Sequence, residues 1–189
     1  MKVLARVLPL AAMMWSLVMA GYKIDVTKLP GATDGIETIA ISPAVCSADV
    51  NCVWVEQKLF EDLAAYRQFR VVSASAVRQA MLELAIEKID DQARIRLAEK
   101  LTADAFLIPI VRHGGKESEG AVGFWPGNMF YMGSDEVSKG SVELVLMKAD
   151  TGKTIVKGVG FGESEWYGQK GVIAKTFRKI LAEAFGPGD

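Results

Sequence analysis

The sequence predicts one α/β (α+β) domain, in which a mixed sheet of about five strands is packed by three to four helices. Strand-like and helix-like segments alternate over the first two thirds of the chain, which is typical of parallel strands joined by helical crossovers. A hairpin-like segment over 141–164 follows late and adds an antiparallel pair. The expected order of elements is therefore β-α-β-α-α-β-β-β-α.

Residues 1–20 have the features of a secretory signal peptide. Two basic residues precede an apolar run over 7–19, and the small residues Ala20 and Gly21 follow it. The run is shorter than the roughly 17–25 residues of a transmembrane helix, so we expect cleavage after Ala20, with an uncleaved anchor as the alternative. Gly21 stands where a lipoprotein signal would need cysteine. We therefore expect an exported, periplasmic protein without an acyl anchor at this site, although membrane contact stays open.

The first half of the domain, which we place at 36–186 after a polar lead-in over 21–35, alternates strands and helices. Period-2 patterns predict strands over 36–42 and 69–75. Helical spacing predicts one helix over 54–66, a second that begins after an N-cap at Ser75, and a third that begins at Asp90-Asp91. A nearly continuous apolar strand over 106–111 follows, as expected for a strand that is covered on both faces. Its Pro109 lacks a backbone donor, which predicts a bulge or an edge position.

The second half contains an insertion and a hairpin. Residues 113–139 are rich in glycine and aromatic residues and have no clear period. The hairpin over 141–164 turns at Asp150-Thr151-Gly152-Lys153, and its second arm places Gly158, Gly160 and Gly162 on one face. A strand face without side chains allows another element to approach closely. A last helix is expected over 171–185.

Charge and cysteine content limit the classes of function. Removal of the leader, with its two basic residues, leaves 20 basic against 23 acidic residues, a net charge of −3, and nothing indicates nucleic acid as a partner. In an oxidising compartment a disulfide between Cys46 and Cys52 is expected, with a metal or redox pair as the alternative. One histidine and two cysteines are too few for a zinc site without carboxylates, so we expect no metal and no cofactor.

Motifs that resemble catalytic signatures all have plainer interpretations. Gly152-Lys153-Thr154 lacks the glycine that a phosphate-binding loop needs five residues earlier, and Asp150-Thr151-Gly152 occurs once where an aspartic protease needs two copies. His113, the only histidine, is the one candidate base for a hydrolase. Asp104, between a helix and a strand, is expected to accept backbone hydrogen bonds at that connection.

Aromatic side chains gather in the insertion and near the last helix, and they are our candidate interaction surface. Exposed aromatic residues concentrate binding energy at protein interfaces. The candidates are Phe124, Trp125, Phe130, Tyr131, Trp166 and Tyr167. A loop folded back on its own sheet is the alternative interpretation of 120–133.

The order of several short segments resembles a family of bacterial envelope proteins. These segments are "IAISPA", "LAAYRQFRVVSASAV", "LAEKLTADAFLIPIV" and "VELVLMKADTGKTIV". They are similar to segments of the proteins grouped around the curli-secretion lipoprotein CsgG, the penicillin-binding-protein activator LpoB and the amino-terminal domain of TolB. Thr102 replaces a glycine of that family, and Pro109 replaces a small residue.

The resemblance implies a periplasmic module that binds other proteins and has no catalytic residues. We therefore expect a non-enzymatic interaction domain in cell-envelope assembly or secretion, whose partner is an envelope or secretion-system protein, with a homo-oligomer as a further option. The alternatives are an oligomeric secretion-channel subunit of the outer membrane and a small secreted hydrolase that uses His113. The insertion is short and rich in glycine, which favours the soluble adaptor.

Overall fold

The computed structural model of the protein describes residues 21–119, 122–125, 128–131, 135–164 and 168–186. The predicted class is confirmed, because four helices pack on a seven-stranded mixed sheet in one domain. The strands are β1 (Tyr22–Lys28), β2 (Thr38–Ile41), β3 (Val45–Cys46), β4 (Arg70–Val72), β5 (Ala105–Glu119), β6 (Val122–Trp125), β7 (Asn128–Tyr131), β8 (Asp135–Lys148) and β9 (Thr154–Ser164). The helices are α1 (Cys52–Ala64), α2 (Ala74–Glu83), α3 (Asp91–Leu101) and α4 (Gln169–Phe185).

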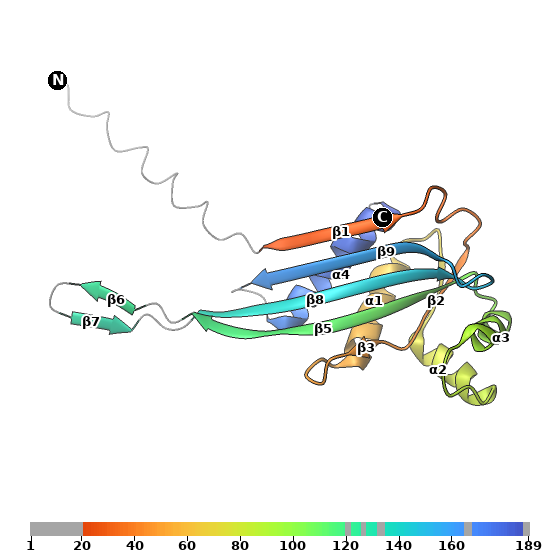
Figure 1. Cartoon of the computed structure of the whole chain (residues 1–189), viewed down its shortest axis with the longest axis horizontal. Helices are drawn as coiled ribbons and strands as arrows, with labels where there is room; N and C mark the ends of the chain where they lie inside the picture. The colour runs from red at the N-terminus through yellow and green to blue at the C-terminus, as the bar shows by residue number, and fades with distance from the viewer. Residues whose placement is uncertain (1–20, 120–121, 126–127, 132–134, 165–167, 187–189) are drawn as a thin grey trace, which may run out of the picture.

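The sheet has the order β1-β9-β8-β5-β2-β4, and β3 also pairs with β5 (Figure 1). β2 runs parallel to β4 and to β5, as the early alternation of strands and helices predicts. The pairs β5–β8, β8–β9 and β9–β1 are antiparallel, and the expected hairpin joins β8 to β9. β6 and β7 form a separate two-stranded sheet.

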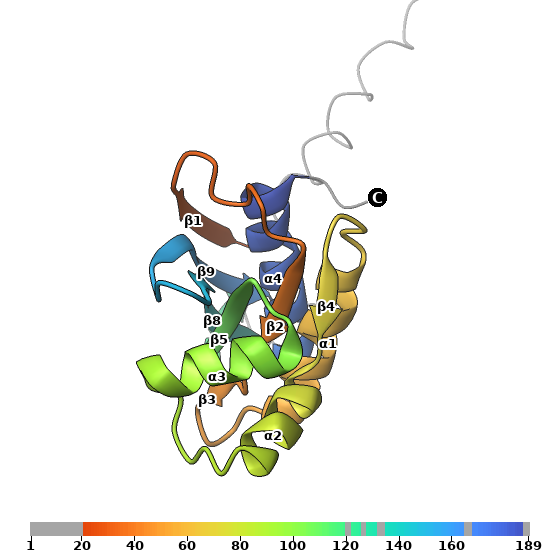
Figure 2. The ribbon, with the colours of Figure 1, turned by 90° about the vertical axis from the view of Figure 1, so that its right-hand side faces the viewer.

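Helices cover the two faces of the sheet unequally (Figures 1 and 2). α1 and α4 pack on one face, where Leu59 and Phe177 are fully buried with Leu107 and Leu144. α2 and α3 pack on the other face only near β2 and the start of β5, around Phe106. The second face of β1, β9, β8 and the remainder of β5 carries no helix of the described chain.

α4 lies directly on the glycine face of β9. A β-carbon at Gly158 would collide with Ile180, one at Gly160 with Thr176, and one at Gly162 would stand 2.9 Å from Val172. The close approach that the alternating glycines predicted is confirmed, and α4 is the element that makes it.

β1 lies in the segment that we expected to be a polar lead-in. Its side chains alternate between half-buried and exposed, and Ile24 and Val26 pack against the core beside α4. β1 is an edge strand that pairs only with β9 along this sheet. An edge strand therefore needs only one apolar face with few apolar residues. This pattern is too weak for β1 to be predicted from the sequence.

Much of the expected insertion is regular. Residues 113–119 and 135–139 continue β5 and β8 as an antiparallel ribbon, whose register shifts between Gly114 and Lys116. Of the two expectations for Pro109, the bulge is wrong, since Pro109 pairs in register with Leu144. The edge position agrees with the structure, because the pairs of β5 with β2 and β3 leave Pro109 out. Ser42 and Ser47 donate to the carbonyls of Leu107 and Val111, so odd-numbered residues here point their backbone groups away from β8. The missing N–H of Pro109 falls between the end of β2 and the start of β3, where no ladder bond is lost.

The N-cap of α2 is Ser73, two residues earlier than expected. Its hydroxyl accepts a hydrogen bond from the amide of Ala76 at 3.3 Å, and its backbone is extended, as capping requires. Ser75 lies inside the first turn of α2, where its hydroxyl is 2.9 Å from that of Ser73. The four alternating serine and alanine residues over 73–76 leave the pattern ambiguous, and the end of β4 at Val72 decides where the helix starts.

The turn between β8 and β9 is clamped by Arg94 of α3. The Arg94 side chain is 8% exposed, its Nε donates to the carbonyl of Ala149 at 3.0 Å, and its guanidinium pairs with Asp91. A β-carbon at Gly152 would stand 2.5 Å from Arg94 Nη1, and Gly152 has a φ of 69°.

We expect Gly152→Ala to lower the free energy of unfolding by about 2 to 3 kcal/mol, because backbone strain and displacement of Arg94 add together. The matched control is Gly35→Ala, which has a similar φ of 72° and no described atom within 4 Å of the added methyl group. It should cost only about 1 kcal/mol, the strain alone. Urea unfolding followed by circular dichroism measures both variants, and equal losses would contradict a role for Arg94.

Candidate functional site

The second face of β1, β9, β8 and the outer part of β5 carries no helix of the described chain, and Figure 1 looks onto it. We call it the open face. Strand register places its side chains in rows that cross all four strands. Its residues are Lys23, Asp25, Thr27, Ile108, Ile110, Arg112, Ser141, Glu143, Val145, Lys157, Val159, Phe161 and Glu163.

Two apolar side chains of β9 on the open face are partly exposed. Val159 is 42% exposed and Phe161 is 39% exposed, although both lie on a strand in the middle of the β1-β9-β8 arrangement. Val45 of β3, which pairs with Ile110, is 59% exposed at the border of this face. Large apolar groups that remain in contact with water on an ordered sheet are a mark of binding surfaces.

Charged residues alternate with the apolar ones. Lys157 Nζ lies 2.9 Å from Glu143 Oε1, and these two side chains are 52% and 20% exposed. An ion pair in this setting contributes only about 0.2 to 1 kcal/mol to stability. Its greater effect is on recognition, because charges at the rim of an apolar patch orient a partner. The open face thus combines apolar contact area with fixed charges, a composition suited to protein binding.

Of the six aromatic residues that the sequence suggested as an interaction surface, four lie in β6 and β7 and two lie outside the described residues. Phe124 and Trp125 lie in β6 and pair with Met129 and Asn128 of β7, and Phe130 and Tyr131 lie in β7 opposite Gly123 and Val122. The hairpin is drawn beyond the outer ends of β5 and β8 (Figure 1). Trp166 and Tyr167 lie outside the described residues, and the interaction surface stays a prediction at all six positions.

Val159 and Phe161 were not among the sequence-based candidates, although a signal for them existed. The string Gly-Val-Gly-Phe-Gly places both side chains on the face opposite the glycines. α4 covers only the glycine face of β9. The opposite face is therefore either covered by another element or exposed to solvent. It is exposed because α2 and α3, which pack on this same face, lie near β2 and the start of β5 and do not reach β9.

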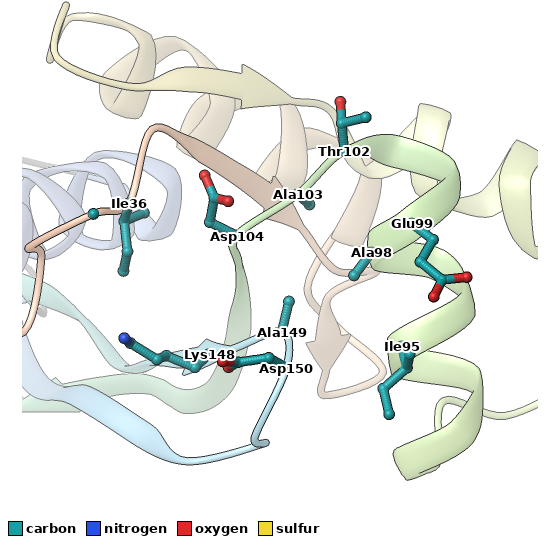
Figure 3. A pocket seen from close by; sticks show the side chains of 11 residues that line it. Ile36, Ile95, Ala98, Glu99, Thr102, Ala103, Asp104, Lys148, Ala149 and Asp150 are labelled. Carbon is teal, nitrogen blue, oxygen red and sulfur yellow. The ribbon is translucent and has the colours of Figure 1, made fainter.

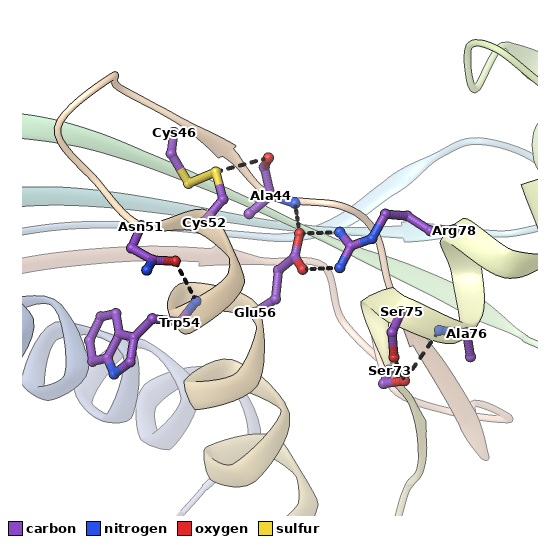
Figure 4. Close-up of polar contacts among 10 residues, drawn as sticks. All are labelled: Ala44, Cys46, Asn51, Cys52, Trp54, Glu56, Ser73, Ser75, Ala76 and Arg78. Carbon is purple, nitrogen blue, oxygen red and sulfur yellow. Dashed lines mark hydrogen bonds and ion pairs between the residues drawn. A yellow bond between two sulfur atoms is a disulfide. The ribbon is translucent and has the colours of Figure 1, made fainter.

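The expected disulfide joins Cys46 of β3 to Cys52, the first residue of α1, with a Cα–Cα distance of 5.9 Å (Figure 4). Asn51 caps the same helix by accepting a hydrogen bond from the amide of Trp54 at 3.0 Å. The cysteine pair therefore fixes the start of α1 to β3, which borders the open face.

A buried carboxylate connects this corner to α2. Glu56 is 6% exposed, and its Oε1 accepts the amide N–H of Ala44 at 2.9 Å. Arg78 donates to both carboxylate oxygens, at 2.7 and 2.6 Å (Figure 4). The hydrogen bonds that Arg78 donates to Glu56 raise the pKa of Arg78 above its usual value, so the guanidinium stays charged. One side chain thus joins α1, α2 and the connection between β2 and β3.

A hollow of about 490 Å³ lies at the opposite end of the sheet, between α3 and the end of β8. The side chains of Asp104, Lys148, Glu99 and Asp150 line it together with apolar residues (Figure 3). Asp104 Oδ2 accepts the amides of Glu37 at 3.0 Å and Thr38 at 2.8 Å, which confirms the expected structural role. The backbone of Asp104 also accepts the amide of Ala149 at 2.9 Å, so this residue fastens β2 and β8 to β5.

A smaller hollow of about 330 Å³ adjoins the open face. Ile108 and Met147 form its sheet side, and Ile89 and Arg94 close it from the direction of α3. It lies where the layer of α2 and α3 ends. A partner on the open face would therefore find an apolar recess at its border.

The motifs at 150–154 lie at the hairpin turn that we expected. Asp150-Thr151-Gly152 forms the turn between β8 and β9, where the amide of Thr151 donates to the carboxylate of Asp150 at 2.6 Å and lowers its pKa. His113 lies in β5 opposite Gly140. Within the described ranges no three His, Cys, Asp or Glu side chains are grouped so as to hold a metal ion. No helix in that part of the chain has the length and apolar content needed to cross a membrane.

The sequence matches no protein-family model and none of the curated proteins. Solved structures resemble the chain at low sequence identity. The PelC dodecamer from Paraburkholderia phytofirmans is 14% identical with a TM-score of 0.54, over 86% of this chain and 96% of that chain. The LpoB C-terminal domain from Escherichia coli is 18% identical with a TM-score of 0.46, over 68% of this chain and 85% of that chain.

A further similar structure is the lipoprotein GNA1162 from Neisseria meningitidis, which is 16% identical with a TM-score of 0.46, over 78% of this chain and 96% of that chain. At these identities the likeness concerns the fold. Structures of LpoB and TolB are among those similar to the chain, as the resemblance in the sequence indicated.

Proposed function

We propose that this chain is an exported, non-enzymatic binding domain of the cell envelope that contacts a protein partner through the open face. The observation that carries the proposal is the exposure of Val159 and Phe161 on a face that no helix of the described chain covers. Leaving such side chains in water is unfavourable, and burying them against a partner contributes to affinity. The leader-like residues 1–20 support a periplasmic location.

The partner is either an envelope or secretion-system protein or a second copy of this chain. The PelC structure, which is similar in fold, is a dodecamer, and this supports self-association as one form of the interaction. The charges on the open face are of both signs, with Lys23 beside Asp25 and Lys157 beside Glu143, so two copies would not repel each other strongly.

A hydrolase that uses His113 has less support. His113 lies in β5, opposite Gly140 of β8. Its backbone lies in the ribbon formed by β5 and β8, which is drawn away from α2 and α3 (Figure 1). A catalytic base needs a nucleophile or a bound water within hydrogen-bond reach and a recess that holds the substrate.

The double substitution Val159→Ser with Phe161→Ser tests the proposal. Because both side chains point away from the core, we expect the melting temperature to change little while the native complex in periplasmic extracts is lost, as seen by sedimentation velocity. Glu183→Ala, on the exposed outer side of α4, is the control and should leave the complex intact. A double variant that sediments like the wild type would contradict the proposal.

A further inference from the structure

β1 begins one residue after the expected cleavage point, so removal of the leader would place a new amino terminus directly on the sheet. Tyr22 is the first residue of β1 and pairs with Gly162 of β9. The amide of Glu163 donates to the carbonyl of Gly21 at 3.0 Å. The backbone of Gly21 is therefore fixed against β9 before the first residue of the strand.

The side chain of Glu163 lies beside Gly21 on the open face. A β-carbon built at Gly21 would stand 3.1 Å from Glu163 Oε1, 3.5 Å from its Cγ and 3.7 Å from its Cδ. All three nearest atoms thus belong to one carboxylate side chain. Gly21 is the residue whose nitrogen becomes a charged terminus if the chain is cut after Ala20.

We propose that cleavage between Ala20 and Gly21 creates an α-ammonium group that pairs with the carboxylate of Glu163 and fastens the edge strand β1 to β9. The exporting cell's signal peptidase supplies the reaction. One water molecule adds across the peptide bond, Ala20 leaves with the new carboxylate, and the nitrogen of Gly21 takes up a proton. Before the cut this nitrogen is a neutral amide, so the ion pair exists only in the processed protein.

The order of events follows from the geometry. A protease needs its substrate segment extended and free of other pairing, and Gly21 and Tyr22 are engaged with β9 in the folded sheet. Cleavage therefore precedes the docking of β1, and the charge that it creates stabilises that docking. Other edge-strand devices are present in β1 as well, since Lys23, Asp25 and Thr27 face outward on it.

The charged groups near the ion pair of Gly21 and Glu163 determine the pH range in which its effect on stability can be measured. Lys139 of β8 lies opposite Glu163, and Lys23 of β1 lies two residues beyond Gly21, while Lys175 of α4 is on the other face above the ring of Tyr22. Lysines titrate near pH 10.4 and histidine near pH 6.5, whereas a terminal amine titrates at about 7.7 to 8.0. The two cysteines are joined in a disulfide. The range from about pH 7 to about pH 9.5 thus covers the reference titration of a terminal amine and ends below the reference value for lysine.

The direction of the pH effect follows from the pairing. A carboxylate partner raises the pKa of the amine in the folded state above its value in the unfolded state. The stabilisation is then complete below about pH 7.7 and is lost as the pH rises through the folded-state pKa. Removal of the Glu163 charge abolishes this loss.

The test uses the full chain, expressed with its leader and recovered from the periplasm. Intact-mass spectrometry should show Gly21 as the first residue. Thermal unfolding at about pH 7 and about pH 9.5 should show an extra fall of about 1 to 3 °C in the wild type that is missing in Glu163→Gln. Glu143→Gln removes a carboxylate from the same face, next to Lys157, and should keep the fall.

A first residue other than Gly21 would overturn the proposal, and so would the same pH dependence in the wild type and in Glu163→Gln. Neither result bears on what the open face binds, because the ion pair forms whether or not a partner is present.

Discussion

Gly160→Val should be the most destabilising single substitution considered for this protein. A β-carbon at residue 160 collides with Thr176, stands 2.8 Å from Ile24 and 3.1 Å from Ile180, so it is blocked by α4 and by β1 at once. Neither backbone element can move without opening the core. We expect a loss of about 3 kcal/mol or more, which corresponds to a fall of roughly 6 to 12 °C in melting temperature.

Two controls separate this clash from other effects. Gly168→Ala changes a glycine at the start of α4 whose added methyl group meets no described atom within 4 Å. Val159→Ala changes the adjacent residue, whose side chain points to the open face. Both should stay within about 1 kcal/mol of the wild type by urea unfolding. If Gly160→Val also unfolds like the wild type, the packing of α4 on the glycine face is wrong.

Glu56→Ala should also have a large effect, a loss of about 2 to 3 kcal/mol. The substitution removes both hydrogen bonds from Arg78 and the acceptor for the amide of Ala44, and it leaves a cavity beside the disulfide-bonded corner. Arg78 is 42% exposed and is still hydrated, which keeps the loss below that of a fully buried ion pair. Thermal and urea unfolding both report this loss.

Substitution of the other member of this ion pair, Arg78, gives a second test. Arg78→Ala leaves the Glu56 carboxylate, with its side chain 6% exposed, without its counter-ion and should cost at least as much as Glu56→Ala. The control is Glu83→Ala, which breaks the exposed pair of Glu83 with Lys100, at 3.0 Å, and should cost under about 1 kcal/mol. Equal losses for Glu56→Ala and Glu83→Ala would show that burial does not strengthen the Glu56 contacts.

The main elements of this fold can be predicted from the sequence because their residue patterns are strong. Alternating strands and helices predict the parallel β4-β2-β5 arrangement, the turn at Asp150-Thr151-Gly152 predicts the β8–β9 hairpin, and the spacing of the glycines in β9 predicts a close neighbour. β1 is missed because an edge strand needs only half of the usual apolar pattern. The ribbon beyond His113 is missed because glycine and charged residues hide the strand period.

The candidate site is less predictable than the fold. An aromatic run such as that around Trp125 attracts attention in a sequence, whereas Val159 and Phe161 look like ordinary strand residues. Their exposure depends on where α2 and α3 pack, which is a tertiary property without a local signal. The disulfide is the opposite case, since the short spacing of Cys46 and Cys52 and the leader-like pattern of residues 1–20 suffice to predict it.

The most direct test of the central claim is photo-cross-linking in living cells from a reactive residue at position 161. We predict a specific covalent adduct with one protein, either another copy of this chain or a second envelope protein, because Phe161 lies on the open face, the proposed binding surface. A reactive residue at position 183, on the exposed outer side of α4, should give no such adduct. The same adducts from both positions, or none from position 161 when the protein is exported and folded, would contradict the claim that the open face binds a partner.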